Sequence, residues 1–149
     1  MKKLFISIVV ITGILSCNKK KDTTGTTPCT VTIPAIAGSY KLTKLETVSF
    51  DNKTIQDITS TLSSCDLSGI YFFNADSTAT YSAAAACSGN SSGTWRLGGV
   101  TGFFTSFNPG NKGIGTTATL ISSWDCTNLQ LMTMYPTVAF NHRFTLTRL

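Results

Sequence analysis

The pattern of hydrophobic and polar positions along the chain is typical of short strands. It is clearest near the C-terminus, where one set of residues alternates with another: Phe140, His142, Phe144 and Leu146 with Asn141, Arg143, Thr145 and Thr147. This period of two predicts a strand with one packed side and one solvent-facing side. The domain is also rich in Thr, Ser, Gly, Phe and Tyr and poor in helix-forming patterns. Together these features predict an all-β fold.

Turn residues divide the rest of the domain into seven or eight strands in simple sequence order. Ala75-Asp76-Ser77 supplies the turn chemistry for a central hairpin. The expected strands are Ser39–Val48, Leu67–Phe73, Thr78–Ala85, Gly93–Leu97, Gly102–Phe107, Thr116–Ser122, Leu129–Met134 and Val138–Leu149. In the segment 55–64, Ile55, Ile58 and Leu62 are instead three or four residues apart, which predicts a short helix or a lid-like loop.

The N-terminus has the features of a secretory signal peptide. Lys2 and Lys3 precede a short apolar run, Leu4–Leu15, and the small residue Ser16 stands directly before Cys17. This arrangement resembles the lipobox of bacterial lipoproteins. The resemblance implies cleavage before Cys17, acylation of that residue with fatty acids such as palmitate, and lasting attachment to a membrane. The alternative is an ordinary secretory signal with an incidental cysteine.

Three regions follow from this interpretation: a cleaved signal peptide (1–16), a lipidated cysteine with a flexible basic and Thr-rich tether (17–34), and one β-barrel domain (35–149). Removing Lys2 and Lys3 leaves ten basic residues against seven acidic ones, a net charge of +3. Lys19–Lys21 accounts for this excess, either by meeting lipid head groups or as a solvated tether. The domain itself is close to neutral, which argues against nucleic-acid binding.

The tether also bears on the location of the protein in the cell envelope. Asn18 after the cysteine resembles the sorting signal for the outer membrane in some bacteria. The signals for surface export in such lipoproteins tend to be acidic, whereas Lys19–Lys21 is basic. We therefore expect an outer-membrane anchor that faces the periplasm rather than the cell surface.

Four cysteines remain besides Cys17, and an even number in an exported chain predicts two disulfide bonds. The hairpin register chooses among the three pairings. With a loop at 75–77, Asn74 faces Thr78, and the same register carried outward places Cys65 opposite Cys87. Cys29 and Cys126 then pair by elimination. The chain has no C-x-x-C pair, so a zinc site is not expected.

Several segments, in this order, resemble the bacterial lipocalin-like lipoproteins. Gly38-Ser39-Tyr40 is similar to the Gly-x-Trp opening of lipocalin-type barrels. The segment 65–87 resembles the central hairpin of the family, with Asp76-Ser77 in place of Asp-Gly, and Gly93–Leu97 and Phe144–Leu149 fit its later strands. The resemblance implies a small antiparallel up-and-down lipocalin-like β-barrel of about eight strands. It also implies a small hydrophobic or amphipathic ligand within the barrel.

The sequence contains few of the residues that catalysis usually requires. His142 is the only histidine and Glu46 the only glutamate, and no serine lies in a Gly-x-Ser-x-Gly elbow. The glycines at 110, 113 and 115 follow a turn rather than a strand, so they do not predict a phosphate-binding loop. We therefore expect no enzymatic activity, no catalytic residue and no cofactor.

The expected binding site is the barrel interior. We expect a ligand to contact Tyr40, Tyr81, Trp95, Phe140 and His142. His142 is alternatively a core or barrel-mouth histidine with a satisfied hydrogen bond, and the aromatic residues alternatively fill a solid core. In that second case the protein is a structural or protein-interaction lipoprotein whose loops form the contact surface.

Overall fold

Residues 29–87, 89–108, 114, 119–134 and 140–149 are described by the computed structural model. Within these ranges the fold is all-β, with nine antiparallel strands and three very short helices. The strands are β1 (Gly38–Val48), β2 (Thr54–Asp57), β3 (Ile70–Phe73), β4 (Thr78–Ser82), β5 (Ser91–Gly98), β6 (Gly102–Asn108), β7 (Thr119–Trp124), β8 (Asn128–Thr133) and β9 (Asn141–Arg148). The helices are α1 (Ile33–Ile36), the 3-10 helix η1 (Thr59–Thr61) and α2 (Ser64–Ser68).

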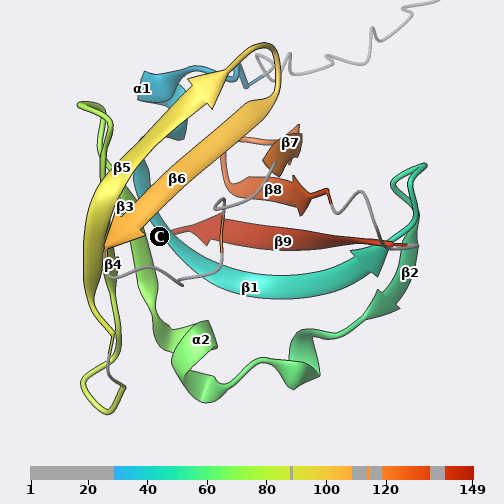
Figure 1. The fold of residues 1–149 in the computed structure, drawn as a ribbon, viewed down its shortest axis with the longest axis horizontal. Coiled ribbons are helices and arrows are strands. Elements are labelled where there is room, and N and C mark those ends of the chain that lie inside the picture. Colours follow the sequence, from blue (N-terminus) through green and yellow to red (C-terminus); the bar gives the residue numbers. More distant parts are fainter. Residues whose placement is uncertain (1–28, 88, 109–113, 115–118, 135–139) are drawn as a thin grey trace, which may run out of the picture.

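Eight of the strands form a barrel-like ring (Figure 1). They follow in the order β1-β3-β4-β5-β6-β7-β8-β9, and β9 pairs back to β1 from Tyr40 to Val48. A register shift at Thr43 bends β1, as an extra residue in one strand does. The other edge of β1 pairs first with β3 and then with β2, which therefore lies outside the ring. The structure thus confirms the predicted all-β up-and-down fold.

The two ends of the ring differ. At the α1 end, where β1 begins, three short turns connect the strands, and each contains a residue with positive φ: Ser77 (70°), Gly99 (61°) and Cys126 (72°). Ser77 adopts this left-handed conformation, and Asp76 supports the turn by accepting hydrogen bonds from the Thr78 amide and hydroxyl. At the opposite end, called the far end below, the connections are longer.

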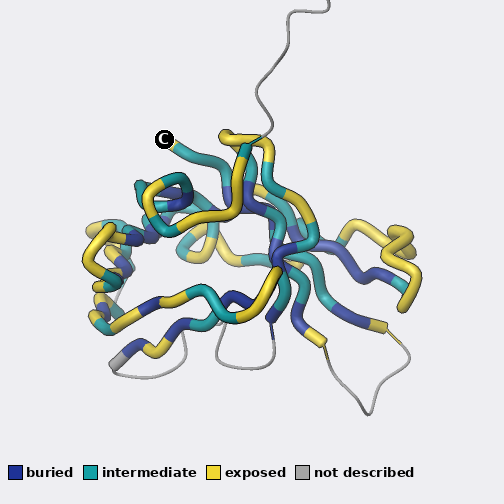
Figure 2. Tube along the Cα trace, turned by 90° about the horizontal axis from the view of Figure 1, so that it is seen from above, coloured by how far each residue is buried: buried dark blue, intermediate teal, exposed yellow. Residues whose placement is uncertain are grey.

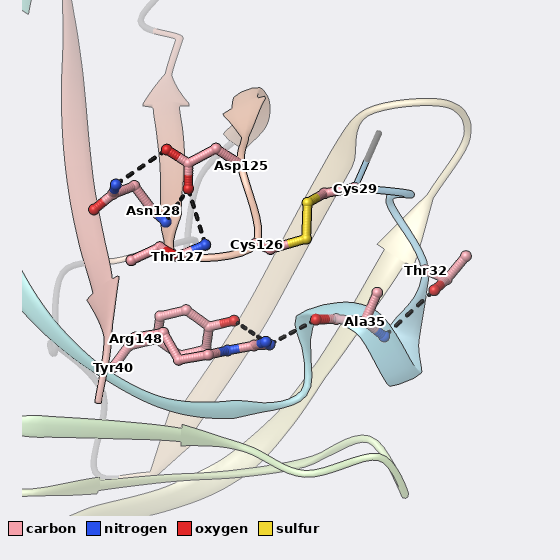
Figure 3. The surroundings of a disulfide bond; sticks show 9 residues. All are labelled: Cys29, Thr32, Ala35, Tyr40, Asp125, Cys126, Thr127, Asn128 and Arg148. Atoms are coloured by element: carbon pink, nitrogen blue, oxygen red, sulfur yellow. Dashed lines mark hydrogen bonds between the residues drawn. A yellow bond between two sulfur atoms is a disulfide. The ribbon is translucent and has the colours of Figure 1, made fainter. Parts of the chain in front are cut away.

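Hydrogen bonds from Tyr40 and Arg148 hold helix α1 against this end of the ring (Figure 3). Arg148 Nη2 donates to the carbonyls of Ala35 (2.6 Å) and Ala37 (3.0 Å) and to the Tyr40 hydroxyl (2.9 Å), which itself donates to the Ile36 carbonyl at 2.5 Å. These donors satisfy carbonyl groups that a helix end leaves unpaired. Burial raises the pKa of Tyr40, although Arg148 opposes that effect.

Both predicted disulfide bonds are present. Cys29–Cys126 joins the segment before α1 to the turn between β7 and β8, as Figure 3 shows. Cys65–Cys87 joins α2 to the segment after β4 at the far end. Each end of the ring therefore carries one covalent link. Such bonds persist in oxidising compartments, so they indicate an extracytoplasmic protein.

The interior is dominated by packed aromatic rings. Phe73 lies between Tyr40, Trp95 and Phe103, with ring centroids 5.7, 5.5 and 5.3 Å away. Tyr71 and Tyr81 extend this cluster toward the far end, with centroids 4.8 Å apart. Figure 2 shows the pattern that produces the core, with buried and exposed residues alternating along the strands. The Ile114 side chain is also buried in this cluster.

Several element boundaries differ from the prediction. Residues 64–68, partly assigned to a strand, form α2 because Ser63 and Asp66 make a reciprocal capping box. The segment 55–64 contains η1, but it begins with strand residues of β2, an element that the spacing of its apolar residues concealed. The strands expected from Thr116 and Val138 begin, within the described residues, at Thr119 and Asn141. Residues 115–118 and 135–139 lie outside the described ranges.

In the last strand His142, Phe144 and Leu146 face inward as predicted, but the side expected to face solvent is partly covered. Asn141 and Thr145 are buried, whereas Phe140, assigned to the packed side, is 41% exposed. The reason is topological: β9 lies between β1 and β8 along its length, and Arg143 on its outer side meets the buried Glu46 of β1. Phe140 precedes the first paired residue of the strand, so among the described residues no neighbouring strand is paired beside it.

Candidate functional site

The five predicted ligand-contacting residues do not form one site. Tyr40 and Trp95 are fully buried in the aromatic core near the α1 end. Tyr81 is buried nearer the far end, where its ring packs at a tilt against Tyr71 and its hydroxyl donates to the Cys65 carbonyl at 3.4 Å. His142 is partly exposed and contacts Phe140, with ring centroids 6.1 Å apart. Of the five, Tyr81, Phe140 and His142 therefore lie toward the far end, whereas Tyr40 and Trp95 lie in the core near the α1 end.

His142 belongs to a row of polar residues on the inner face of the sheet. Thr119 faces Thr133, Thr133 faces His142, and His142 faces Thr47, on the neighbouring strands β7, β8, β9 and β1. We call these four residues the polar row. The next row toward the α1 end is entirely apolar and contains Ile121, Leu131, Phe144 and Leu45 in the same strand order. The inner wall therefore changes from polar to apolar within one row.

The three threonines of the polar row are buried. Thr119, Thr133 and Thr47 are 1%, 2% and 9% exposed. The Thr47 hydroxyl donates to the Gln56 carbonyl at 3.4 Å. The Thr133 hydroxyl is buried and has no hydrogen-bond partner among the described residues. A buried polar group without a partner is unfavourable, so Thr133 Oγ1 is well placed to bond an incoming ligand.

Sequence reasoning found His142 but missed the three threonines. A signal was present, because Thr119 and Thr133 continue the alternation of Ile121 and of Leu129 and Leu131. Threonine is common on both sides of a strand, however, so its inward direction could be assigned only by the apolar neighbours two residues away.

On the outer face, a charged cluster fixes the β1–β2 hairpin. The Glu46 carboxylate accepts hydrogen bonds from Lys44 Nζ (2.8 Å), Arg143 Nε (2.9 Å) and Thr54 Oγ1 (3.0 Å). Arg143 also donates to Asn52 Oδ1 at 3.1 Å, at the tip of the hairpin. Burial alone would raise the pKa of Glu46, but the three hydrogen bonds and the charge of Arg143 outweigh it and lower the pKa. The cluster is internally satisfied, so its geometry is that of a structural clamp.

Glu46→Gln is expected to lower the free energy of unfolding by about 2 kcal/mol at pH 7, because charged hydrogen bonds to Arg143 and Lys44 are lost. The lowered pKa means that the carboxylate stabilises the fold above its unfolded value near 4.5 and stops doing so as the pH falls through the folded value. The stability difference between wild type and variant should therefore shrink below pH 4.5. Urea unfolding of both proteins across this range measures it, and a constant difference would contradict the assignment.

Metal binding receives no support from the part of the chain that the structure describes, where no cluster of three or more His, Cys, Asp or Glu side chains could hold an ion. None of the helices in the described ranges is long and apolar enough to cross a membrane. Comparison with protein-family models, curated proteins and solved structures gives no match for this chain. The interpretation of the site therefore depends on its geometry and on the sequence.

Proposed function

We propose that this protein is a non-enzymatic, lipid-anchored envelope lipoprotein of the lipocalin-like kind whose barrel binds a small hydrophobic or amphipathic molecule. The observation that carries the binding proposal is the polar row directly beside an apolar row on one inner wall. An amphipathic ligand would place its polar group beside Thr133 and His142 and its apolar part against Phe144 and Leu131. A ring of eight strands is wide enough to hold one small ligand.

The anchoring part of the proposal rests on the sequence. Cys17, the proposed site of lipidation, lies outside the described residues, as do the signal peptide and most of the tether. The disulfide bonds agree with an exported protein. Within this proposal the partners are an outer membrane, reached from its periplasmic side through the lipid, and a small ligand. The near-neutral domain argues against a nucleic-acid partner.

Ligand binding is tested by displacing a fluorescent fatty acid from the mature protein. Thr133→Val keeps the shape of the side chain but removes the buried hydroxyl, and His142→Ala removes the partly exposed imidazole. Each substitution should weaken binding about five- to tenfold, the effect of one lost hydrogen bond. Thr94→Val, on an exposed position of β5, is the matched control and should bind as wild type does. Equal binding by all three variants, or no bound molecule and no probe binding at all, would contradict the proposal.

A second candidate is a protein-interaction lipoprotein with a filled core. The packed rings of Tyr40, Phe73, Trp95 and Phe103 favour it, because they occupy the interior near the α1 end. In this case the far-end loops would contact a protein partner, and organic extraction of the purified protein would release no small molecule.

A further inference from the structure

His142 is the member of the polar row that can carry a positive charge. It lies between Thr133 of β8 and Thr47 of β1, which face it on either side, and its ring contacts Phe144 with centroids 6.5 Å apart. His142 and Phe144 both point into the ring, yet both remain partly exposed. The inner wall is therefore open beside these two residues, although the threonines on either side of His142 are buried.

The acidic side chains that the structure describes lie elsewhere than on this inner wall. They are found in the outer charged cluster, at the tip of the β1–β2 hairpin, in the cap of α2 and in turns at the α1 end: Glu46, Asp57, Asp51, Asp66, Asp76 and Asp125. Each of them accepts hydrogen bonds or pairs with a basic side chain in its own place. An anion beside the polar row would therefore meet no described carboxylate there.

The strands packed against His142 bring no described charge to the inner wall. β1 and β8 present Thr47 and Thr133, neither of which titrates. The charged residues of β1 and β9 next to this row, Glu46 and Arg143, lie on the outer face and pair with each other at 2.9 Å. Toward the far end, β3 and β4 also contribute the inward-facing Tyr71 and Tyr81. Burial raises the pKa of both tyrosines, so they stay neutral in the range where histidine titrates.

We propose that the polar row binds preferentially amphiphiles whose head group is an anion, and that protonation of His142 strengthens this binding. The inference rests on the proposed function of the same wall. Thr133 Oγ1 is buried without a hydrogen-bond partner among the described residues, so its hydroxyl can donate to an anionic oxygen. A charged imidazole adds a donor and a positive charge, and hydrogen bonds between charged groups are about twice as strong as neutral ones. A cationic head group would find no opposite charge on this wall.

Titration of the ¹⁵N-labelled mature protein with decyl sulfate, 1-decanol and decyltrimethylammonium, below the concentrations at which micelles form, tests the proposal. Histidine gains its proton between about pH 8 and pH 5, so binding is compared at about pH 8 and about pH 5.5. The three amphiphiles share one chain and differ in charge, and the sulfate remains an anion at both pH values. Decyl sulfate should bind about five- to tenfold more tightly at the lower pH. Decanol should bind equally at both, and the cation more weakly than decanol.

The backbone amides of β8 and β9 report whether binding occurs at the polar row. Equal binding of decanol and decyl sulfate at the lower pH, or sulfate binding that does not change with pH, would overturn this inference and leave the proposed function intact. If none of the three amphiphiles shifts these amides, the proposed function fails as well.

The His142 ring gives a second measurement, because it is the only histidine in the sequence and its signals are distinct. Coupling between two bound species is reciprocal, so saturating decyl sulfate should move the titration midpoint of these signals to higher pH, whereas decanol should not raise it. His142→Gln keeps a hydrogen-bonding side chain that cannot become charged, and it should remove the pH dependence of sulfate binding. Thr94→Val, at an exposed position of β5, should retain it. An unmoved midpoint, or pH dependence that persists in His142→Gln, would contradict the proposal.

Discussion

Replacing Cys29 and Cys126 together by alanine is expected to lower the free energy of unfolding by about 4.5 kcal/mol. The two residues are 97 positions apart, so the bond restricts nearly the whole domain in the unfolded state. The entropy that a cross-link removes from the unfolded chain grows with the length of the loop it closes. Guanidinium unfolding of the oxidised wild type and of the double variant measures the difference.

The second disulfide is the matched control for this experiment. Cys65 and Cys87 are 22 residues apart, so replacing both by alanine should lower stability by about 3 kcal/mol, less than for the long loop. Helix α1 keeps its hydrogen bonds from Arg148 and Tyr40 when Cys29 is replaced, so the native end of the ring should remain intact. A larger loss for the Cys65 and Cys87 pair than for the Cys29 and Cys126 pair would contradict this account.

The sequence predicted best what is decided locally. The hairpin loop at 75–77 sets the register between β3 and β4, and the structure has the pairing of Ile70 with Ser82 that this register requires. The predicted Cys65–Cys87 bond is also present, although the strand pairing ends at Ile70 and Ser82 and Cys65 lies in α2. The alternation of buried residues in β4 and β8 follows from the sequence in the same way, because each strand has one polar and one apolar face.

The features that the sequence did not predict depend on pairing between segments that are distant in the chain. β2 was not predicted because its four residues are exposed and carry no alternation; it exists because β1 extends beyond β3 and offers a free edge. The register shift at Thr43 also has no signal in the sequence. It determines which residues of β1 face β9 and so brings Thr47 beside His142. The polar row therefore could not be assembled from any single segment, since its members come from four strands.

The distribution of side chains inside the ring connects the fold to the binding proposal. The α1 end is covered by a helix, joined by short turns and filled by aromatic rings. The polar row lies toward the other end. Stability and binding are thus expected to depend on different residues, and substitutions at the filled end should change the first without changing the second.

Trp95→Ala tests this separation directly and should lower the free energy of unfolding by about 3–5 kcal/mol, as removal of a large buried ring does. Trp95 is 1% exposed, its ring packs 5.5 Å from Phe73 and 5.8 Å from Phe103, and its indole nitrogen donates to the Asn74 carbonyl at 2.8 Å. Fatty-acid binding should be unchanged under conditions in which the variant remains folded. Chemical unfolding and fatty-acid displacement together decide the outcome.

The second tryptophan provides the control for the hydrogen bond. Trp95→Phe keeps an aromatic ring but leaves the Asn74 carbonyl without its donor, so it should lower stability by about 1–2 kcal/mol. The indole nitrogen of Trp124 is buried without a partner among the described residues, so Trp124→Phe removes an unsatisfied group and should be nearly neutral. Equal losses for the two phenylalanine variants would show that ring volume alone matters. A loss below 1 kcal/mol for Trp95→Ala would mean that the α1 end is loosely packed, and the ligand would then have room in the part of the ring that these contacts assign to the core.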